Sequence, residues 1–351
     1  MQQIIKSIQP ATDMEKIIRL IPHDKLFLLT DTHTHQHCTP LLAGVSAIRE
    51  ATEIVIPAND THKTLENLSK VWLELTQRGA TRHSLLINLG GGMVTDLGGF
   101  AAATFKRGIK YINLPTTLLG AVDAAVGGKT GINFGGYKNE IGAFYPSEYV
   151  IISSLFFRTL DRRAILSGYA EMIKHALIHS ETDWEQILTF KFDKPDYEAL
   201  NELVFRSVEI KREIVEKDPF EKNIRKALNL GHTTAHAFES FAISNGAPVP
   251  HGYAVAWGMI VELYLSHRIC GFPKEKLLTT VRFIQQHYGA FAISCDDYDR
   301  LREIARHDKK NVDDQINFTL LSDTGKVRID QTAGEGLFFE ALDFYRDSVG
   351  L

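Results

Sequence analysis

Short apolar runs alternate with segments of helical periodicity through the first half of the chain. The runs are rich in aliphatic side chains and have the length of buried strands: residues 25–30, 53–57, 84–88, 111–114 and 149–152. Between the second and third runs, residues 61–78 carry apolar side chains at helical spacing. Because strands that alternate with helices form a parallel sheet with helices on both faces, we expect a Rossmann-like α/β domain over residues 1–158.

The pattern changes to helices after residue 153. Helical periodicity predicts helices at residues 161–179, 202–216, 251–269, 276–288, 298–307 and 334–347. Two apolar runs separated by Asp323-Thr324-Gly325 predict a β-hairpin over residues 316–329. Since 351 residues are too many for one small core, we expect a second, mainly α-helical domain over residues 159–351, with the active site in the cleft between the domains.

Bulk composition excludes several classes of protein. Hydrophobic residues make up 44% and charged residues 23% of the chain, which is typical of a globular protein. A net charge of −4 argues against a nucleic-acid binder, and we expect no membrane span because no apolar run approaches roughly 20 residues. The N-terminus lacks a signal-peptide pattern, and three widely spaced cysteines predict no disulfide framework. We therefore expect a cytoplasmic protein.

Three consecutive glycines, Gly90, Gly91 and Gly92, follow the third predicted strand and precede a helical segment. Glycines at such a junction let the backbone approach a ligand, and the following helix N-terminus favours a phosphate. The spacing differs from the GxGxxG pattern of the commonest dinucleotide fold, and a tight turn explains it equally well. Lys106 and Arg107 at the end of that helix fit either an anion site or compensation of the helix dipole.

Residues 115–144 show no clear helical or strand period and are rich in glycine. A loop of this length in a compact domain is usually functional. Its Gly127-Gly128-Lys129-Thr130 is similar to part of a P-loop, but Asp123 stands where that pattern requires a glycine. ATP or GTP hydrolysis is therefore not expected.

The densest chemistry lies in residues 225–236. If this stretch forms one helix, Arg225, Asn229, His232 and His236 share a face, and such a face suits an anionic ligand together with a metal. Gly231 could break the helix. Two histidines four residues apart, without the arginine and the asparagine, are more often ordinary surface residues than ligands.

Glu171 and the histidines at 232, 236 and 251 could supply the three ligands of a catalytic zinc site. A salt-bridged surface face is the alternative for Glu171, Lys174 and His175. The second half also contains cations that would suit a polyanionic substrate such as a phosphorylated carboxylate: Lys174, Lys211, Arg225, Lys309 and Lys310. A metal in one domain and a nicotinamide in the other would suit redox chemistry on an alcohol.

Several segments resemble the 3-dehydroquinate synthase family, the sugar-phosphate cyclases of the shikimate pathway. The similar segments keep the family's order along the chain: residues 90–100, 105–108, 114–119, 126–133, 138–142, 167–171, 225–236 and 251–252. Each segment alone is weak, but together they are highly specific. The resemblance implies a dehydroquinate-synthase-like fold.

The resemblance also implies roles for individual residues. Glu171, His232 and His251 would bind one divalent metal, Zn or Co, so that His236 would face the substrate. The implied NAD contacts are Asp31, Asp60, Lys63, Gly91, Gly92, Thr95, Asp96, Thr116, Thr117, Lys129, Lys138 and Thr159. The implied substrate contacts are Arg107, Asp123, Lys129, Asn139, Lys174, Lys211, Arg225, Asn229, His236 and one of Lys309 and Lys310.

The implied activity converts 3-deoxy-D-arabino-heptulosonate 7-phosphate, a phosphorylated sugar acid, to 3-dehydroquinate and phosphate. NAD oxidises a ring hydroxyl transiently, phosphate is eliminated, NADH reduces the ketone again, and an aldol reaction closes the carbocycle. This is the second step toward chorismate and the aromatic amino acids. The family also implies a homodimer.

The chain departs from the family pattern at a few positions. Asn59-Asp60 replaces Gly-Glu, which puts one nucleotide contact in doubt, and Asp161 replaces a proline. Alanines replace a glutamine and two serines around Asp123: Ala121, Ala124 and Ala125. The alternating histidines of residues 33–37 could bind a metal, but we expect an exposed polar loop.

Three other functions remain open. The nearest are sister cyclases of the 2-deoxy-scyllo-inosose synthase type, followed by a metal-dependent alcohol or glycerol dehydrogenase. Lys211, Arg225 and Asn229 favour a carboxylate-bearing substrate over both. An inactive binding protein is the third, and the intact set of metal-ligand candidates argues against it.

Overall fold

In the computed structural model, which describes residues 2–135, 137–306 and 316–351, the chain divides into two units. The first unit contains Met1–Gly168 and Lys194–Arg212, and the second contains Tyr169–Asp193 and Glu213–Leu351. Two of the three unit boundaries fall within long helices, α7 (Arg162–His179) and α9 (Tyr197–Lys217), and the third, between Asp193 and Lys194, precedes α9.

A parallel six-stranded sheet forms the centre of the first unit, in the order β1-β8-β5-β4-β2-β3. The expected strands are confirmed: β2 (Leu26–Asp31), β3 (Thr52–Ile56), β4 (Leu85–Gly90), β5 (Lys110–Pro115) and β8 (Tyr149–Ile152). The structure adds the edge strand β1 (Gln3–Lys6), which the sequence did not predict because only Ile4 and Ile5 are apolar in it.

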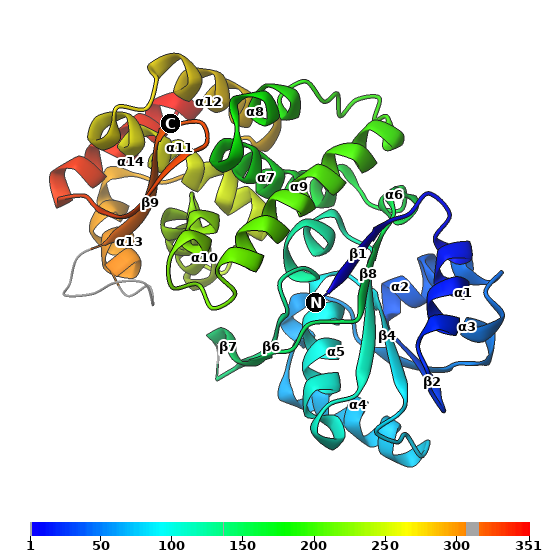
Figure 1. The fold of residues 1–351 in the computed structure, drawn as a ribbon. Helices are drawn as coiled ribbons and strands as arrows, with labels where there is room; N and C mark the ends of the chain where they lie inside the picture. Colours follow the sequence, from blue (N-terminus) through cyan, green and yellow to red (C-terminus); the bar gives the residue numbers. More distant parts are fainter. Residues whose placement is uncertain (1, 136, 307–315) are drawn as a thin grey trace. The chain divides into compact units, whose positions relative to one another are not determined.

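Helices cover both faces of this sheet, as Figure 1 shows. Alternate residues of each strand point to opposite faces, so Phe27 and Leu29 of β2 enter one apolar cluster and Leu28 enters the other. The first cluster includes side chains of α4 (Leu65–Gln77) and α5 (Gly92–Thr104). The second cluster includes α1 (Pro10–Leu20), α3 (Ser46–Glu50) and α6 (Ser154–Phe157). The predicted Rossmann-like α/β arrangement is therefore confirmed.

The expectation that residues 115–144 lack regular structure was wrong. They contain a short π-helix at Gly120–Ala124 and an antiparallel hairpin of β6 (Lys129–Phe134) and β7 (Tyr137–Phe144). In β6, Thr130 and Ile132 are buried, Gly131 lies between them and Lys129 at the start of the strand is exposed. The apolar strand pattern is therefore too short to be recognised in the sequence. Hydrogen bonding between the two strands, rather than an apolar pattern, defines this hairpin.

The expected polar loop at residues 33–37 is instead a short helix, α2 (Thr32–His37). The Asp31 carboxylate accepts hydrogen bonds from the backbone N–H groups of His33 and Thr34, and Thr34 completes a capping box. His35 is exposed and lies 2.9 Å from the Glu53 carboxylate. The capping of a six-residue helix explains why histidines without an apolar period are helical here.

The second unit is mainly helical, as expected. Besides part of α7 and α9, it contains α8 (Glu181–Ile187), α10 (His232–Ser244), α11 (His251–Cys270), α12 (Lys274–Tyr288), α13 (Tyr298–Arg306) and α14 (Glu335–Val349). The predicted hairpin is present as β9 (Asn317–Asp323) and β10 (Lys326–Thr332). Throughout the described parts of the chain, every helix is too short or too polar to span a bilayer.

Candidate metal centre and cofactor site

Three helices of the second unit bring Glu171, His232 and His251 together. Glu171 lies within α7, whereas His232 and His251 are the first residues of α10 and α11. Nε2 of His232 lies 3.3 Å from Glu171 Oε1, and Nε2 of His251 lies 3.5 Å from the same oxygen. The three ligand atoms lie within 4.8 Å of one another, and among the described residues this is the group that could hold a metal ion. It is also the set that the family resemblance implied.

Gly231 divides the segment that could have formed one helix over residues 225–236. A 3₁₀ helix covers Ile224–Asn229, and Gly231 then adopts a left-handed conformation with φ of 81° before α10 begins. Arg225 and Asn229 therefore do not belong to the helix that carries the two histidines. The single-helix interpretation was wrong because the backbone reverses at the glycine, which favours positive φ.

The far side of each imidazole is occupied by a hydrogen-bond acceptor. His251 Nδ1 lies 3.1 Å from the Glu239 carboxylate, and His232 Nδ1 lies 3.2 Å from the Leu230 carbonyl. An acceptor at Nδ1 keeps a proton there, so that the neutral form of each ring has its lone pair at Nε2. Both Nε2 atoms face Glu171 Oε1, a buried oxygen without a hydrogen-bond partner in the described structure. Three acceptors that converge in this way fit a divalent cation.

Charges around Glu171 support this assignment. The Lys174 ammonium pairs with Glu171 Oε2, and both residues are buried. Burial raises the pKa of Glu171, but Lys174 and His232 outweigh it and hold that pKa well below its usual range. Burial and Lys174 lower the pKa of His232 to about 4, so its ring is neutral at physiological pH, as a metal ligand must be.

His251 differs from His232 in its acidic neighbours. Burial lowers its pKa, but the contacts with Glu171 and Glu239 outweigh burial and raise the pKa to about 10. Without a metal, a proton on His251 therefore offsets the charge of the two carboxylates. A divalent ion bound at Glu171 would take over that role and displace the proton.

His236 lies next to both histidine ligands. Its ring centroid is 5.6 Å from that of His232 and 6.4 Å from that of His251. The structure thus places His236 beside the candidate metal centre but outside the group of ligand atoms.

Two predicted substrate residues of the second unit, Arg225 and Asn229, are held by the loop before the 3₁₀ helix. Arg225 is buried; its backbone N–H donates to Asp218 Oδ2 at 3.1 Å, and its guanidinium donates to the Pro219 carbonyl at 2.6 Å. The Asn229 amide donates to Glu221 at 3.0 Å. Lys309 and Lys310 lie outside the described residues.

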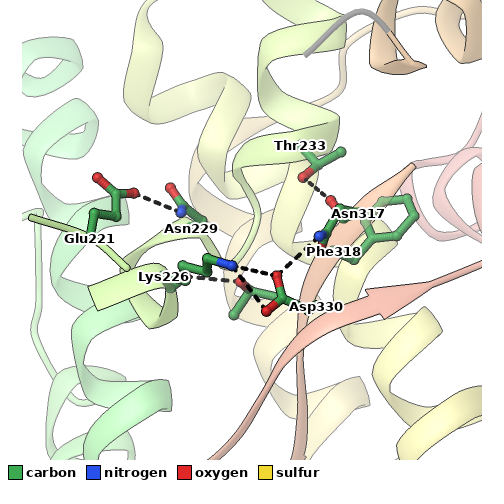
Figure 2. A pocket seen from close by; sticks show the side chains of 8 residues that line it. Glu221, Lys226, Asn229, Thr233, Asn317, Phe318 and Asp330 are labelled. Carbon is green, nitrogen blue, oxygen red and sulfur yellow. Dashed lines mark hydrogen bonds and ion pairs between the residues drawn. The ribbon is translucent and has the colours of Figure 1, made fainter. Parts of the chain in front are cut away.

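A cavity of about 380 Å³ lies beside the first turn of α10. Figure 2 shows Thr233 of α10 hydrogen-bonded to the strand residue Asn317 on its wall, with Asn229 and the ion pair of Lys226 and Asp330 also lining it. The two charged groups of that ion pair lie 2.8 Å apart. The cavity includes Asn229 but none of the three candidate metal ligands. Its lining therefore connects one predicted substrate residue to the β9–β10 hairpin.

In the first unit, the predicted NAD residues gather at the carboxyl ends of three adjacent strands. Asp31 ends β2, Gly91 and Gly92 follow β4, and Thr116 and Thr117 follow β5. The chain leaves β2 toward β3 and returns on the other side as β4, so the strand order reverses between β2 and β4. Open α/β sheets bind nucleotides at such a reversal, and the N-terminus of α5 lies there with no side-chain cap.

A second group of predicted NAD residues surrounds Lys63. The buried Lys63 ammonium lies 3.1 Å from Asp96 and 3.4 Å from Asp60, and Lys138 lies 4.0 Å from Asp60. Burial raises the pKa of Asp96 to about 6, against the opposing effect of Lys63. Asn133 donates to the Asp60 carbonyl at 3.1 Å and thereby ties this group to the β6–β7 hairpin. Asp60 thus remains paired to Lys63 although it is one methylene shorter than the family's glutamate.

The remaining predicted residues are dispersed over the first unit. The Lys211 ammonium donates to the Asp123 carbonyl at 2.6 Å and also pairs with its carboxylate. Thr95 donates to the Gly92 carbonyl, and Thr159 donates to the Phe156 carbonyl. Three others are exposed, Lys129 and Asn139 on the hairpin and Arg107 at the end of the segment after α5.

Glu239 is a site residue that the sequence reasoning missed. It lies three residues after His236 on α10, and its contact with His251 crosses to another helix. Its spacing of three residues indicates that Glu239 lies near His236 on the same helix, but no local sequence pattern indicates that it contacts His251 on α11.

Comparisons with known proteins identify the family. Residues 53–167 match the model of the 3-dehydroquinate synthase N-terminal region, and residues 168–311 match that of its C-terminal region. The chain is 51% identical over 350 residues to 3-dehydroquinate synthase of Parabacteroides distasonis, covering 100% of this chain and 99% of the relative. It is 35% identical over 321 residues to the enzyme of that name from Streptococcus pyogenes serotype M6, covering 91% and 89%.

Solved structures with the same fold come from related and more distant enzymes. The 2-epi-5-epi-valiolone synthase of Streptomyces hygroscopicus subsp. jinggangensis 5008, with NAD⁺ and Zn²⁺ bound, matches with a TM-score of 0.85 at 22% identity over 99% of this chain and 97% of that one. A 2-deoxy-scyllo-inosose synthase complexed with carbaglucose-6-phosphate, NAD⁺ and Co²⁺ matches at 0.82 and 22% identity over 97% and 95%. At these identities the solved structures establish the fold, and the family models and the full-length relatives establish more: this chain belongs to the 3-dehydroquinate synthase family.

Proposed function

We propose that this protein is a 3-dehydroquinate synthase that converts 3-deoxy-D-arabino-heptulosonate 7-phosphate to 3-dehydroquinate and phosphate. The observation that carries the proposal is the 51% identity to a synthase of that name along the full chain. The buried Glu171 and His232, together with the partly buried His251, supply the ligand set that such an enzyme needs. The reaction makes the protein a carbon–oxygen lyase without net redox change.

Glu171 Oε1 and the Nε2 atoms of His232 and His251 would hold the metal, because these atoms converge and the opposite side of each ring is already bonded. Three protein ligands leave a coordination position open to substrate. A bound Zn²⁺ or Co²⁺ would supply Lewis acidity toward substrate hydroxyls.

The carboxyl ends of β2, β4 and β5 would hold NAD. The backbone N–H groups that begin α5 suit the pyrophosphate, and the Asp96 carboxylate suits hydroxyl groups of the cofactor. When bound, NAD supplies a hydride acceptor for one substrate alcohol and returns the hydride later in the reaction.

We assign the substrate's anionic groups to basic side chains. Lys174, Lys211 and Arg225 are buried cations, and each already contacts an oxygen of a carboxylate or carbonyl group. Buried cations exchange such contacts for phosphate or carboxylate oxygens at lower solvation cost than exposed ones. His236 lies beside the metal ligands and is suited to moving a proton on the substrate. One of Lys309 and Lys310 would add a further cation.

Two alternatives share the fold. A sister cyclase of the 2-deoxy-scyllo-inosose synthase type and a glycerol dehydrogenase match the fold with TM-scores of 0.82 and 0.67 but with only 22% and 13% identity. Fold similarity at this level leaves the substrate open, whereas the relatives at 51% and 35% identity favour the dehydroquinate reaction.

The test is to incubate the purified protein with NAD⁺, Co²⁺ or Zn²⁺ and the heptulosonate phosphate. We expect equimolar phosphate and 3-dehydroquinate without accumulation of NADH. Steady NADH formation from glycerol would identify a dehydrogenase instead, and turnover of glucose 6-phosphate in place of the heptulosonate would identify a sister cyclase.

We further propose that the protein acts in the cytoplasm as a homodimer. This proposal rests on the family resemblance. Light scattering should give twice the 39.4 kDa mass of the chain, and a monomer at assay concentration that is fully active would overturn the dimer.

A further inference from the structure

Glu262 is a fully buried carboxylate in the middle of α11. Its oxygens accept hydrogen bonds from two backbone N–H groups at the start of α10, that of Gly231 at 2.6 Å and that of Thr234 at 3.0 Å. A buried carboxylate in contact with two main-chain donors on a neighbouring helix is a specific arrangement, because charged groups are seldom buried without such partners.

These two hydrogen bonds replace a helix cap that α10 cannot make for itself. An N-cap side chain normally accepts from the third residue of the helix, which here is Thr234, but Gly231 occupies the N-cap and has no side chain. Gly231 has φ of 81°, and a Cβ at this position would lie 2.8 Å from Met259 Cγ. Because neither the conformation nor the space admits a larger residue, the cap comes from α11.

The capped turn is the one that positions a metal ligand. Gly231 lies between Leu230, whose carbonyl contacts His232 Nδ1, and His232 itself. Glu262 therefore holds the N–H of the residue before His232 and of the second residue after it. Fixing the backbone on both sides of His232 fixes the direction of its ring toward Glu171.

The helix that carries Glu262 also begins with a metal ligand, His251. The two helices approach each other closely, since a Cβ on Gly258 of α11 would lie 2.1 Å from the Gly231 carbonyl oxygen. The Glu262 bonds thus join the backbone at one ligand to the helix of the other. The helix dipole of α10 adds a favourable interaction with the carboxylate.

We propose that Glu262 is a positioning residue of the metal centre, which presets His232 relative to His251. This inference rests on the proposed metal site. It predicts that weakening the Glu262 cap lowers the metal affinity of the folded protein, and that loss of a buried hydrogen bond elsewhere on α11 does not.

Glu262→Gln is the test variant, because it keeps the shape but directs an amide N–H₂ at one of the two backbone donors. The matched control is Ser266→Ala on the same helix. Ser266 is also buried, donates to the Glu262 carbonyl at 2.7 Å and accepts from Leu321 N–H at 3.0 Å, but it does not contact α10 through these bonds. Both variants lose a buried hydrogen bond, and only Glu262→Gln loses the cap.

Co²⁺ affinity is measured by competition with a chelator, and the geometry of the bound ion by its visible d–d absorption. We expect Glu262→Gln to bind Co²⁺ about 10- to 100-fold more weakly, as is typical for residues that orient a ligand, and to show an altered absorption spectrum. Glu262→Asp should recover part of the affinity because it retains the charge. Ser266→Ala should bind Co²⁺ as the wild type does.

Wild-type affinity and spectrum in a folded Glu262→Gln protein would overturn the proposal, as would an equal loss in Ser266→Ala. If the wild-type protein itself binds no Co²⁺, the metal site and the inference resting on it both fail. If the wild type binds Co²⁺ and Glu262→Gln binds it equally well, the positioning role is refuted and the metal site stands. Should Glu262→Gln not fold, amide exchange in the wild type decides: protection of Gly231 and Thr234 in the metal-free protein supports presetting, and free exchange there contradicts it.

Discussion

Each histidine of the candidate centre is held by an acceptor on the side of its ring that faces away from Glu171. For His232 that acceptor is a backbone carbonyl, and for His251 it is the Glu239 side chain. The difference matters, because a carboxylate makes the ring more basic and a carbonyl does so less. Only the contact of His251 can be removed by substitution of a side chain.

We therefore expect Glu239→Gln to weaken metal binding by about 10- to 100-fold, because the neutral amide orients His251 less firmly and lowers its basicity. Equilibrium dialysis with Zn²⁺ measures the effect. Glu340→Gln is the matched control, since Glu340 accepts from Tyr264 in the second unit and belongs to none of the contacts at the metal centre that are described above. Unchanged Zn²⁺ affinity in Glu239→Gln would contradict the assigned role.

Asp96 gives the cofactor site a pH dependence. Burial raises its pKa to about 6, so the carboxylate is charged above pH 6 and becomes protonated below it. If the charged form accepts hydrogen bonds from NAD, the dissociation constant of NAD should be constant at neutral pH and about tenfold higher at pH 5, one unit below the pKa. Isothermal titration from pH 5 to 8 measures this curve, and Asp96→Asn should remove its slope. A wild-type curve that stays flat would exclude Asp96 as a charged contact.

At the scale of elements, the turn between the 3₁₀ helix and α10 determines where His232 lies. Gly231→Ala should destabilise the protein for two reasons, the left-handed conformation and the contact with Met259. The conformation costs about 1–2 kcal/mol, and an overpacked contact adds about 1–3 kcal/mol. Urea denaturation of the metal-free protein measures the sum.

Gly246→Ala separates these two contributions. Gly246 follows α10 with φ of 70°, and a Cβ there would meet nothing within 4 Å, so this substitution tests the conformation alone. We expect the free energy of unfolding to fall further in Gly231→Ala than in Gly246→Ala. Equal losses would show that the approach of α11 does not constrain the turn.

The elements also mark how far sequence could predict this structure. Strands such as β4 and helices such as α12 follow from uninterrupted apolar periods, because burial of a continuous face dominates their folding. The β6–β7 hairpin and α2 could not be predicted in this way, since inter-strand hydrogen bonds and the Asp31 cap define them. Similarly, the end of the 3₁₀ helix at Gly231 depends on the contact of this glycine with α11. The sequence could indicate only that a glycine at this position can interrupt a helix.

At the scale of the molecule, the two units carry different parts of the proposed chemistry, the NAD residues in the first and the metal ligands in the second. The sequence predicts the same division, with NAD in a domain over residues 1–158 and the metal in a domain over residues 159–351, and the roles of the two units in NAD and metal binding stay predictions. The identity of the metal ligands needed the family resemblance, because residue spacing left His232, His236 and His251 equivalent. The structure separates them by geometry: two Nε2 atoms lie near Glu171 Oε1, and His236 stands beside their rings.

This separation can be tested on the stability of the whole protein. A ligand that binds only the folded state raises the free energy of unfolding by about 2.7 kcal/mol when its free concentration is 100 times its dissociation constant. Wild-type protein should gain this amount on addition of Zn²⁺ and lose it with EDTA, as measured by chemical denaturation. His251→Ala should lose the gain, because two ligands remain, whereas His236→Ala should keep it while losing turnover. If His236→Ala also loses the Zn²⁺-dependent stabilisation, His236 is a fourth ligand, and the assignment of His236 to the substrate is wrong.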